Sequence, residues 1–93
     1  MKKAVIIKII GQVQGVGFRY NAKGEADRLG ICGFAKNEPG GEVLIEAEGE
    51  EGAIDQFISW CKSGPDSAQV ERVETKIIPP PSCDGFDVIE TKI

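Results

Sequence analysis

A glycine-rich stretch near the start of the chain, residues 11–19 (GQVQGVGFR), has the residue types and spacing of an anion-binding loop. Glycine lets backbone N–H groups converge on a ligand without interference from a Cβ, and the N-terminus of a following helix adds partial positive charge. Arg19 adds a planar fork of N–H donors that matches the geometry of phosphate oxygens. These nine residues therefore contain what is needed to hold a small phosphate group.

The alternative is an ordinary glycine-rich turn, with Arg19 solvated or ion-paired, because short glycine patterns recur by chance. The arginine favours the functional interpretation. The first turn of a helix is the place where the helix dipole prefers an acidic residue, yet this helix begins with Phe18 and Arg19. An uncompensated arginine at that position is expected where an anion is to bind.

Asn37 is the second candidate, at the end of a predicted strand and before the turn at residues 38–41. Asparagine is common in turns, so a purely structural role is the alternative. A neutral amide can also orient a water molecule without repelling a phosphate, as a carboxylate would. Three cations could supplement this site but are more typical of surface charges, namely Lys23, Arg28 and Lys36.

Composition narrows the chemistry. The chain has no histidine, which removes the commonest general base and metal ligand. Its formal net charge is −4 over 93 residues, so a general nucleic-acid or membrane surface is not expected. Three cysteines without a C-x-x-C pair favour reduced structural thiols over a disulfide framework, a zinc site or a nucleophile. With no signal peptide or bilayer-length apolar run, a cytoplasmic location is expected.

Seven elements must position these residues. The β-branched runs predict strands, and the spacing of apolar residues by three and four predicts helices. The predicted strands are 3–10, 31–37, 42–48, 70–78 and a short edge strand within 85–90, and the predicted helices are 18–29 and 51–63. The order β-α-β-β-α-β indicates an α+β, ferredoxin-like split βαβ plait in a single domain, 1–93. Two helices would cover one face of a mostly antiparallel sheet of four to five strands.

Two long motifs resemble those of the acylphosphatase family. Residues 11–19 match G-x-V-Q-G-V-x-[FY]-R in full. Residues 33–49 match G-[FYW]-[AVC]-K-N-x3-G-x-V-x5-G in full, with Asn37 as the motif asparagine. The order of elements and the length agree as well, so the resemblance covers nearly the whole chain.

The resemblance implies hydrolysis of an acyl phosphate to a carboxylate and inorganic phosphate, by a monomer that needs no metal or cofactor. The backbone N–H groups of the loop and the Arg19 side chain would bind the phosphoryl group, and Asn37 would orient the attacking water. The implied phosphate-binding residues are Gln14, Gly15, Val16, Gly17, Phe18 and Arg19. An acyl phosphate has a good leaving group, so the missing histidine is no obstacle, and the phosphate itself can accept the water's proton.

The chain departs from the family at two positions. Ala22 stands where many members have threonine, and Glu38 stands where many have a small or hydroxyl residue after the asparagine. In addition, Gly24 could loosen the helix that carries Arg19. These differences bear on rate and stability more than on reaction type.

Two other functions are alternatives for a chain of this pattern. A non-catalytic module that binds phosphate or carbamoyl phosphate has the same fold, and such domains occur at the start of hydrogenase-maturation proteins; a chain that ends with the fold favours a free-standing enzyme. An RNA-binding plait would need basic charge and exposed aromatic residues on its sheet.

Overall fold

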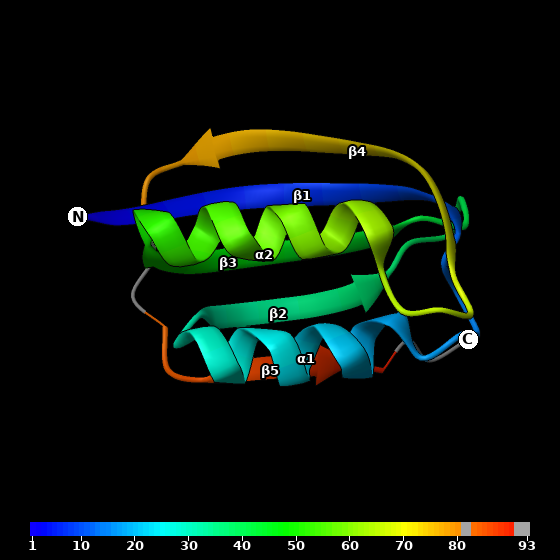
Figure 1. Ribbon diagram of the computed structural model, residues 1–93, viewed down its shortest axis with the longest axis horizontal. Coiled ribbons are helices and arrows are strands. Elements are labelled where there is room, and N and C mark those ends of the chain that lie inside the picture. The colour runs from blue at the N-terminus through cyan, green and yellow to red at the C-terminus, as the bar shows by residue number, and fades with distance from the viewer. Residues whose placement is uncertain (81–82, 91–93) are drawn as a thin grey trace.

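The computed structural model describes residues 1–80 and 83–90. Its elements are β1 (Lys2–Gln12), α1 (Phe18–Leu29), β2 (Cys32–Asn37), β3 (Val43–Glu50), α2 (Glu51–Ser63), β4 (Gln69–Ile78) and β5 (Phe86–Ile89) (Figure 1). Of the proline-rich break expected at 79–82, residues 81 and 82 lie outside the described residues. Among the described residues, no helix combines the length and apolarity needed to cross a bilayer.

The five strands form one sheet in the order β4-β1-β3-β2-β5. All neighbouring strands are antiparallel except β2 and β5, which run parallel. Both helices lie on the same face, with α2 over β1 and β3 and α1 over β2 and β5 (Figure 1). The predicted ferredoxin-like α+β plait is therefore confirmed.

The core lies between the sheet and the two helices. In β1, Val5, Ile7 and Ile9 are buried, and the residues opposite them in β3 are buried as well. Ile6 and Lys8, on the other face of β1, retain solvent exposure. This is the period-two pattern of a sheet covered on one side, as the sequence predicts.

Both helices have their predicted bounds, and each ends at a glycine. Gly30 follows α1 with φ 71°, and its N–H bonds back to the last turn of the helix. Gly64 follows α2, and its N–H donates to the carbonyl of Trp60 at 2.8 Å. Trp60 itself packs against Phe18 and Phe57, with ring centroids 5.3 and 6.2 Å away, in the packing role that its spacing predicts.

The first strand is longer than predicted. It continues through Gly11 and Gln12, with an irregularity after Ile10 where the pairing with β4 shifts. Gly11 has φ 142°, and a Cβ there would collide with the backbone carbonyl of Gln69. The glycine therefore serves the close approach of β4, and the connection between β1 and α1 is confined to residues 13–17.

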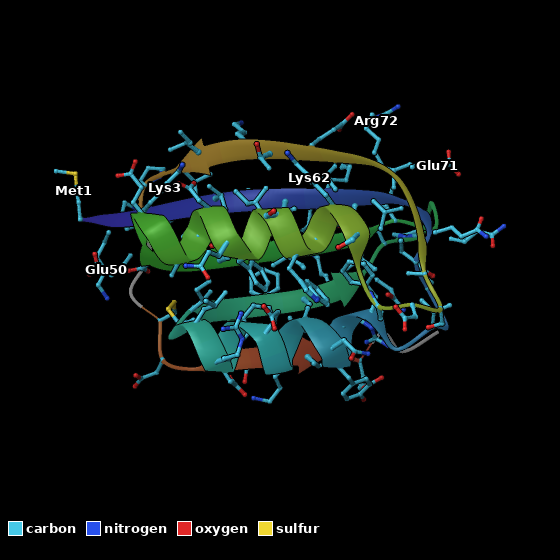
Figure 2. All side chains as sticks on the ribbon, viewed as in Figure 1. Met1, Lys3, Glu50, Lys62, Glu71 and Arg72 are labelled. Carbon is cyan, nitrogen blue, oxygen red and sulfur yellow. A yellow bond between two sulfur atoms is a disulfide. The ribbon has the colours of Figure 1, made fainter. Side chains whose placement is uncertain are left out.

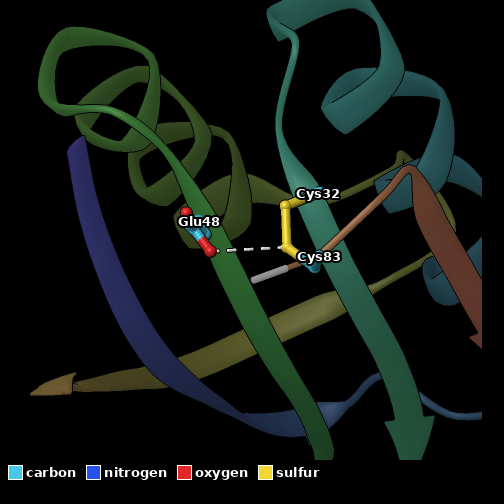
Figure 3. Close-up of side chains that lie close together, drawn as sticks. All are labelled: Cys32, Glu48 and Cys83. Atoms are coloured by element: carbon cyan, nitrogen blue, oxygen red, sulfur yellow. Dashed lines mark hydrogen bonds between the residues drawn. A yellow bond between two sulfur atoms is a disulfide. The ribbon is translucent and has the colours of Figure 1, made fainter. Parts of the chain in front are cut away.

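The expectation of reduced cysteines is wrong for two of the three. Cys32 and Cys83 form a disulfide across 51 positions of sequence (Figure 3). Parallel pairing of β5 with β2 brings the segment before β5 to the start of β2, where the Gly33 N–H donates to the Gly85 carbonyl at 2.9 Å. Cys61 is free and buried as expected, and burial raises the pKa of its thiol, which keeps it unreactive.

Loss of the disulfide should destabilise the fold. A cross-link over 51 residues removes enough freedom from the unfolded chain to contribute about 4 kcal/mol in the chain-entropy account. We expect the double variant C32S/C83S to lose about 2–4 kcal/mol of unfolding free energy in urea titrations. Dithiothreitol should lower the midpoint of the natural protein but not that of the variant. An equal midpoint for all four samples would contradict a stabilising disulfide.

Candidate active site

The candidate residues gather at one end of the sheet. Because β1 and β2 are both antiparallel to β3, their C-terminal ends lie at the same edge. The loop after β1 leads there into the N-terminus of α1, and β2 ends there at Asn37 (Figure 1). At the opposite end, the N-terminal ammonium of Met1 pairs with Glu50 at 2.7 Å (Figure 2). The topology therefore brings the two predicted motifs to a common edge.

The loop presents a helix N-terminus to solvent. Gly15 and Gly17 have φ 74° and 75°, the left-handed conformation that glycine adopts without strain. The first bond of α1 runs from the Asn21 N–H to the Gly17 carbonyl at 3.0 Å, and the Asn21 side-chain amide donates to the same carbonyl at 2.8 Å. Within residues 1–80 and 83–90, none of the backbone N–H groups of residues 14–19 donates to a backbone carbonyl. These donors suit an anion.

Packing and a side-chain bond fix the shape of the loop. Val13 and Phe18, on either side of the glycines, are buried in the core. Between them, the Val16 carbonyl accepts a hydrogen bond from the Ser67 hydroxyl at 2.9 Å. These contacts orient the N–H groups of the loop without the help of a ligand, an arrangement that would lower the cost of binding an anion.

Arg19 is not the uncompensated cation that its position suggests. Its Nη1 donates to the Ile89 carbonyl at 2.6 Å and lies 3.7 Å from the Glu90 carboxylate, and its Cζ lies 5.8 Å from the centroid of the Tyr20 ring. The side chain is only 17% exposed. The end of β5 therefore orients the guanidinium, and the five N–H donors of arginine leave others for a phosphate.

Glu90 joins two side chains of the first helical turn. It accepts a hydrogen bond from the Tyr20 hydroxyl, and this bond, followed by the charge of the carboxylate, raises the pKa of Tyr20. Because Glu90 is also paired with Arg19, its negative charge opposes an anion at that guanidinium. No local pattern in the sequence indicates this contact, since the partners are about 70 positions apart.

Removal of that charge should strengthen phosphate binding. The Glu90 side chain is 63% exposed, so the effect is screened and small. We expect Glu90→Gln to lower the inhibition constant of inorganic phosphate about two- to fivefold at low ionic strength. In 0.5 M salt the two proteins should converge. A higher inhibition constant for the variant would show that the orienting effect of Glu90 outweighs its charge.

Asn37 is the last residue of β2 and pairs with Val43. Val43 is buried beneath the helices, and residues paired across neighbouring strands share a face. Asn37 is thus directed to the helix-covered face, the side on which the loop and α1 lie, and its Oδ1 is buried. The register therefore favours the predicted juxtaposition with the loop.

One side chain links the two motifs directly. The Gln14 Nε2 donates to the Glu38 carbonyl at 2.7 Å and to the Glu42 carbonyl at 2.9 Å. These carbonyls lie on the two arms of the turn that follows Asn37. The motif predicts Gln14 only as one residue of the phosphate-binding loop. The hydrogen bonds of its side chain to the turn are not apparent from the sequence.

The additional cations and the departures from the family have ordinary surroundings. Lys23 pairs with Asp27, Arg28 with Glu25 and Lys36 with Glu38, which confirms their prediction as surface charges. Arg72, the arginine on β4, pairs with Glu74. Ala22 is fully buried against the core.

One cluster has the donor types of a metal site, but its sulfurs are engaged. Cys32, Cys83 and Glu48 have ligand atoms within 4.8 Å of one another (Figure 3). The two sulfurs are bonded to each other and cannot act as thiolates, and Glu48 lies 3.6 Å from the Cys83 sulfur. Cys32 begins β2 and Asn37 ends it, so this cluster is separate from the candidate site.

Known proteins are similar to this chain in sequence and in fold. Residues 5–88 match the model of the family described as acylphosphatase. A protein of Nocardioides sp. named acylphosphatase is 49% identical over 76 residues, which cover 82% of this chain and 77% of that protein. The structure of an acylphosphatase from Coxiella burnetii superposes with a TM-score of 0.91 at 31% identity, covering 95% of this chain and 93% of that one. T. kodakarensis HypF matches 98% of this chain with 12% of its own, at 33% identity and a TM-score of 0.82.

Proposed function

This chain belongs to the acylphosphatase family, and we propose that it hydrolyses acyl phosphates with Arg19 and Asn37 as its catalytic side chains. The observation that supports these roles most is the meeting of both motifs at one edge of the sheet, where preoriented backbone donors lie beside Arg19. A small-molecule acyl phosphate is the substrate. A carboxylate and inorganic phosphate are the products.

The phosphoryl group occupies the loop. Its oxygens accept hydrogen bonds from the backbone N–H groups of residues 14–19 and from the Arg19 guanidinium. These donors stabilise the negative charge on the phosphoryl oxygens in the transition state. Such electrostatic stabilisation accounts for most of the catalysis of phosphoryl transfer. The chain carries a formal charge of −4, so this local arrangement, and not the overall field, attracts the anion.

Asn37 holds the nucleophile. The oxygen of a water molecule bound to its amide forms a bond to phosphorus, and the bond between phosphorus and the acyl oxygen breaks. The electron pair of that bond leaves with the carboxylate. One proton of the water passes to a phosphate oxygen, so that no basic side chain is required. The reaction then depends on positioning and electrostatics, without a metal or cofactor.

The domain organisation, oligomeric state and location of the protein belong to the same proposal. We take residues 1–93 as one domain that acts as a monomer, independent of nucleic acid and membranes. The large apolar side chains that are exposed among the described residues are Met1 at the N-terminus, Tyr20 on α1, Ile77 on β4 and Ile89 on β5. A cytoplasmic location is part of the proposal, and the Cys32–Cys83 disulfide is the observation against it, because disulfides are typical of oxidising compartments.

A phosphate-binding module is the second candidate. The similarity to 12% of the HypF chain shows that this fold also occurs within a much longer protein. Such a module would bind phosphate at the same loop without turnover. The two candidates therefore differ in rate and not in affinity.

Turnover distinguishes the enzyme from the phosphate-binding module. We expect the protein to release phosphate from benzoyl phosphate and acetyl phosphate at catalytic concentrations, in buffer containing EDTA, at many turnovers per site. Calorimetry with inorganic phosphate measures occupancy of the loop in the same preparation. Phosphate binding with no release above the spontaneous rate would favour the module and contradict the enzyme.

A further inference from the structure

The side chain of Gln14 connects two segments that strand pairing does not join. The loop follows β1 and Asn37 ends β2, but these strands are not neighbours, because β3 lies between them. In the part of the chain that the structure describes, no ladder of backbone hydrogen bonds therefore holds the loop against the end of β2. The Gln14 side-chain amide connects the loop to the turn after β2 by two hydrogen bonds, whose partners are 24 and 28 positions away in the sequence.

Both acceptors already belong to the turn. The Glu38 carbonyl accepts from the Gly41 N–H at 3.1 Å, and the Glu42 carbonyl accepts from the Glu38 N–H at 2.8 Å. Each carbonyl oxygen has two lone pairs, so each can also accept one proton of the Gln14 NH2 group. A single side chain thereby attaches both arms of the turn to the phosphate loop.

The geometry points to Gln14 as a positioning residue for the attacking water. Glu38 directly follows Asn37, so a bond to the Glu38 carbonyl fixes the backbone on which the Asn37 amide is carried. The backbone N–H of Gln14 belongs to the proposed phosphate cradle, while its side chain holds the end of β2. One residue therefore sets the separation between the phosphorus and the water, an inference that rests on the proposed function.

The role of the side chain is separable from phosphate binding. Methionine is close to glutamine in length but has no N–H to donate, and Gln14→Met leaves the backbone N–H in place. A misplacement of about 1 Å can reduce a rate roughly a hundredfold, so we expect kcat for benzoyl phosphate to fall about 10- to 100-fold. The inhibition constant of inorganic phosphate should stay within about twofold, since neither Arg19 nor the loop backbone changes.

A double-mutant cycle tests the link to Asn37. If Gln14 acts through Asn37, Gln14→Met should change kcat by less than about twofold in the Asn37→Ala background, because no positioned water remains to be lost. Equal losses in both backgrounds would overturn the inference. So would a rise in the phosphate inhibition constant that accounts for the whole loss of kcat/KM.

Two further measurements guard against a merely structural effect. Gln14→Lys retains a donor within reach of the carbonyls and should recover part of the lost kcat, whereas recovery no better than with methionine contradicts the role of the hydrogen bonds. In 15N-labelled protein, Gln14→Met should shift the side-chain amide resonances of Asn37, a readout independent of activity. Absent turnover by the natural protein would count against the proposed function, while turnover that depends on Asn37 but not on Gln14 would count against this inference alone.

Discussion

Replacing Arg19 by alanine is expected to lower kcat/KM for benzoyl phosphate about a thousandfold or more. An arginine that neutralises the equatorial oxygens of a transferring phosphoryl group has an effect of this size. The structure adds that the guanidinium is held by the Ile89 carbonyl and is largely shielded from water, so its orientation is set in advance. Both the rate and the inhibition constant of inorganic phosphate should worsen, because the same donors meet the phosphate in the ground state and the transition state.

Two variants make that result interpretable. Arg28→Ala removes an exposed arginine of the same helix, paired only with Glu25 among the described residues, and should retain kcat within about twofold. Arg19→Lys keeps the charge but loses the planar fork, and should recover only part of the activity. An Arg19→Ala protein that folds and keeps more than a tenth of kcat/KM would contradict the proposed role.

Replacing Asn37 by alanine is expected to lower kcat roughly a hundredfold or more while phosphate affinity changes little. The amide is assigned to the water and not to the phosphoryl group, so its loss removes a positioned reactant. Steady-state rates on benzoyl phosphate and inhibition by inorganic phosphate measure the two effects separately.

The aspartate variant distinguishes chemistry from packing. Asn37→Asp has the same shape as asparagine, but it lacks the NH2 donors and its negative charge repels the phosphate. It should therefore be no more active than Asn37→Ala. An unchanged kcat in Asn37→Ala, or full activity in Asn37→Asp, would remove the amide from the mechanism.

The sequence predicts the helices more sharply than the strand ends. Gly30 and Gly64 end the helices in conformations that other residues rarely adopt, so both predicted bounds hold. The end of β1 could not be predicted, because glycine is common in turns and yet Gly11 lies within the strand. Its conformation depends on the passage of β4, which no local pattern reveals.

Contacts between distant segments account for what the sequence did not predict at the site. The residue types at the loop and at Asn37 are local signals, and the order of elements places them at one edge. The restraint on Arg19 comes from residues 89 and 90, and the bridge from Gln14 depends on the shape of the turn at residues 38–42. The Cys32–Cys83 bond was missed for the same reason, since it depends on the parallel pairing of a four-residue strand.

The destination of the water oxygen tests the central claim most directly. The natural protein would hydrolyse benzoyl phosphate in 18O-enriched water, with the spontaneous reaction subtracted and both products analysed by mass spectrometry. In the proposed reaction, the loop holds the phosphoryl group and a water bound to Asn37 attacks the phosphorus. This attack places one 18O in each inorganic phosphate and none in benzoate. Enzyme-dependent 18O in the benzoate would mean attack at the acyl carbon, which contradicts the assignment of this loop and Asn37 as a phosphoryl-transfer site.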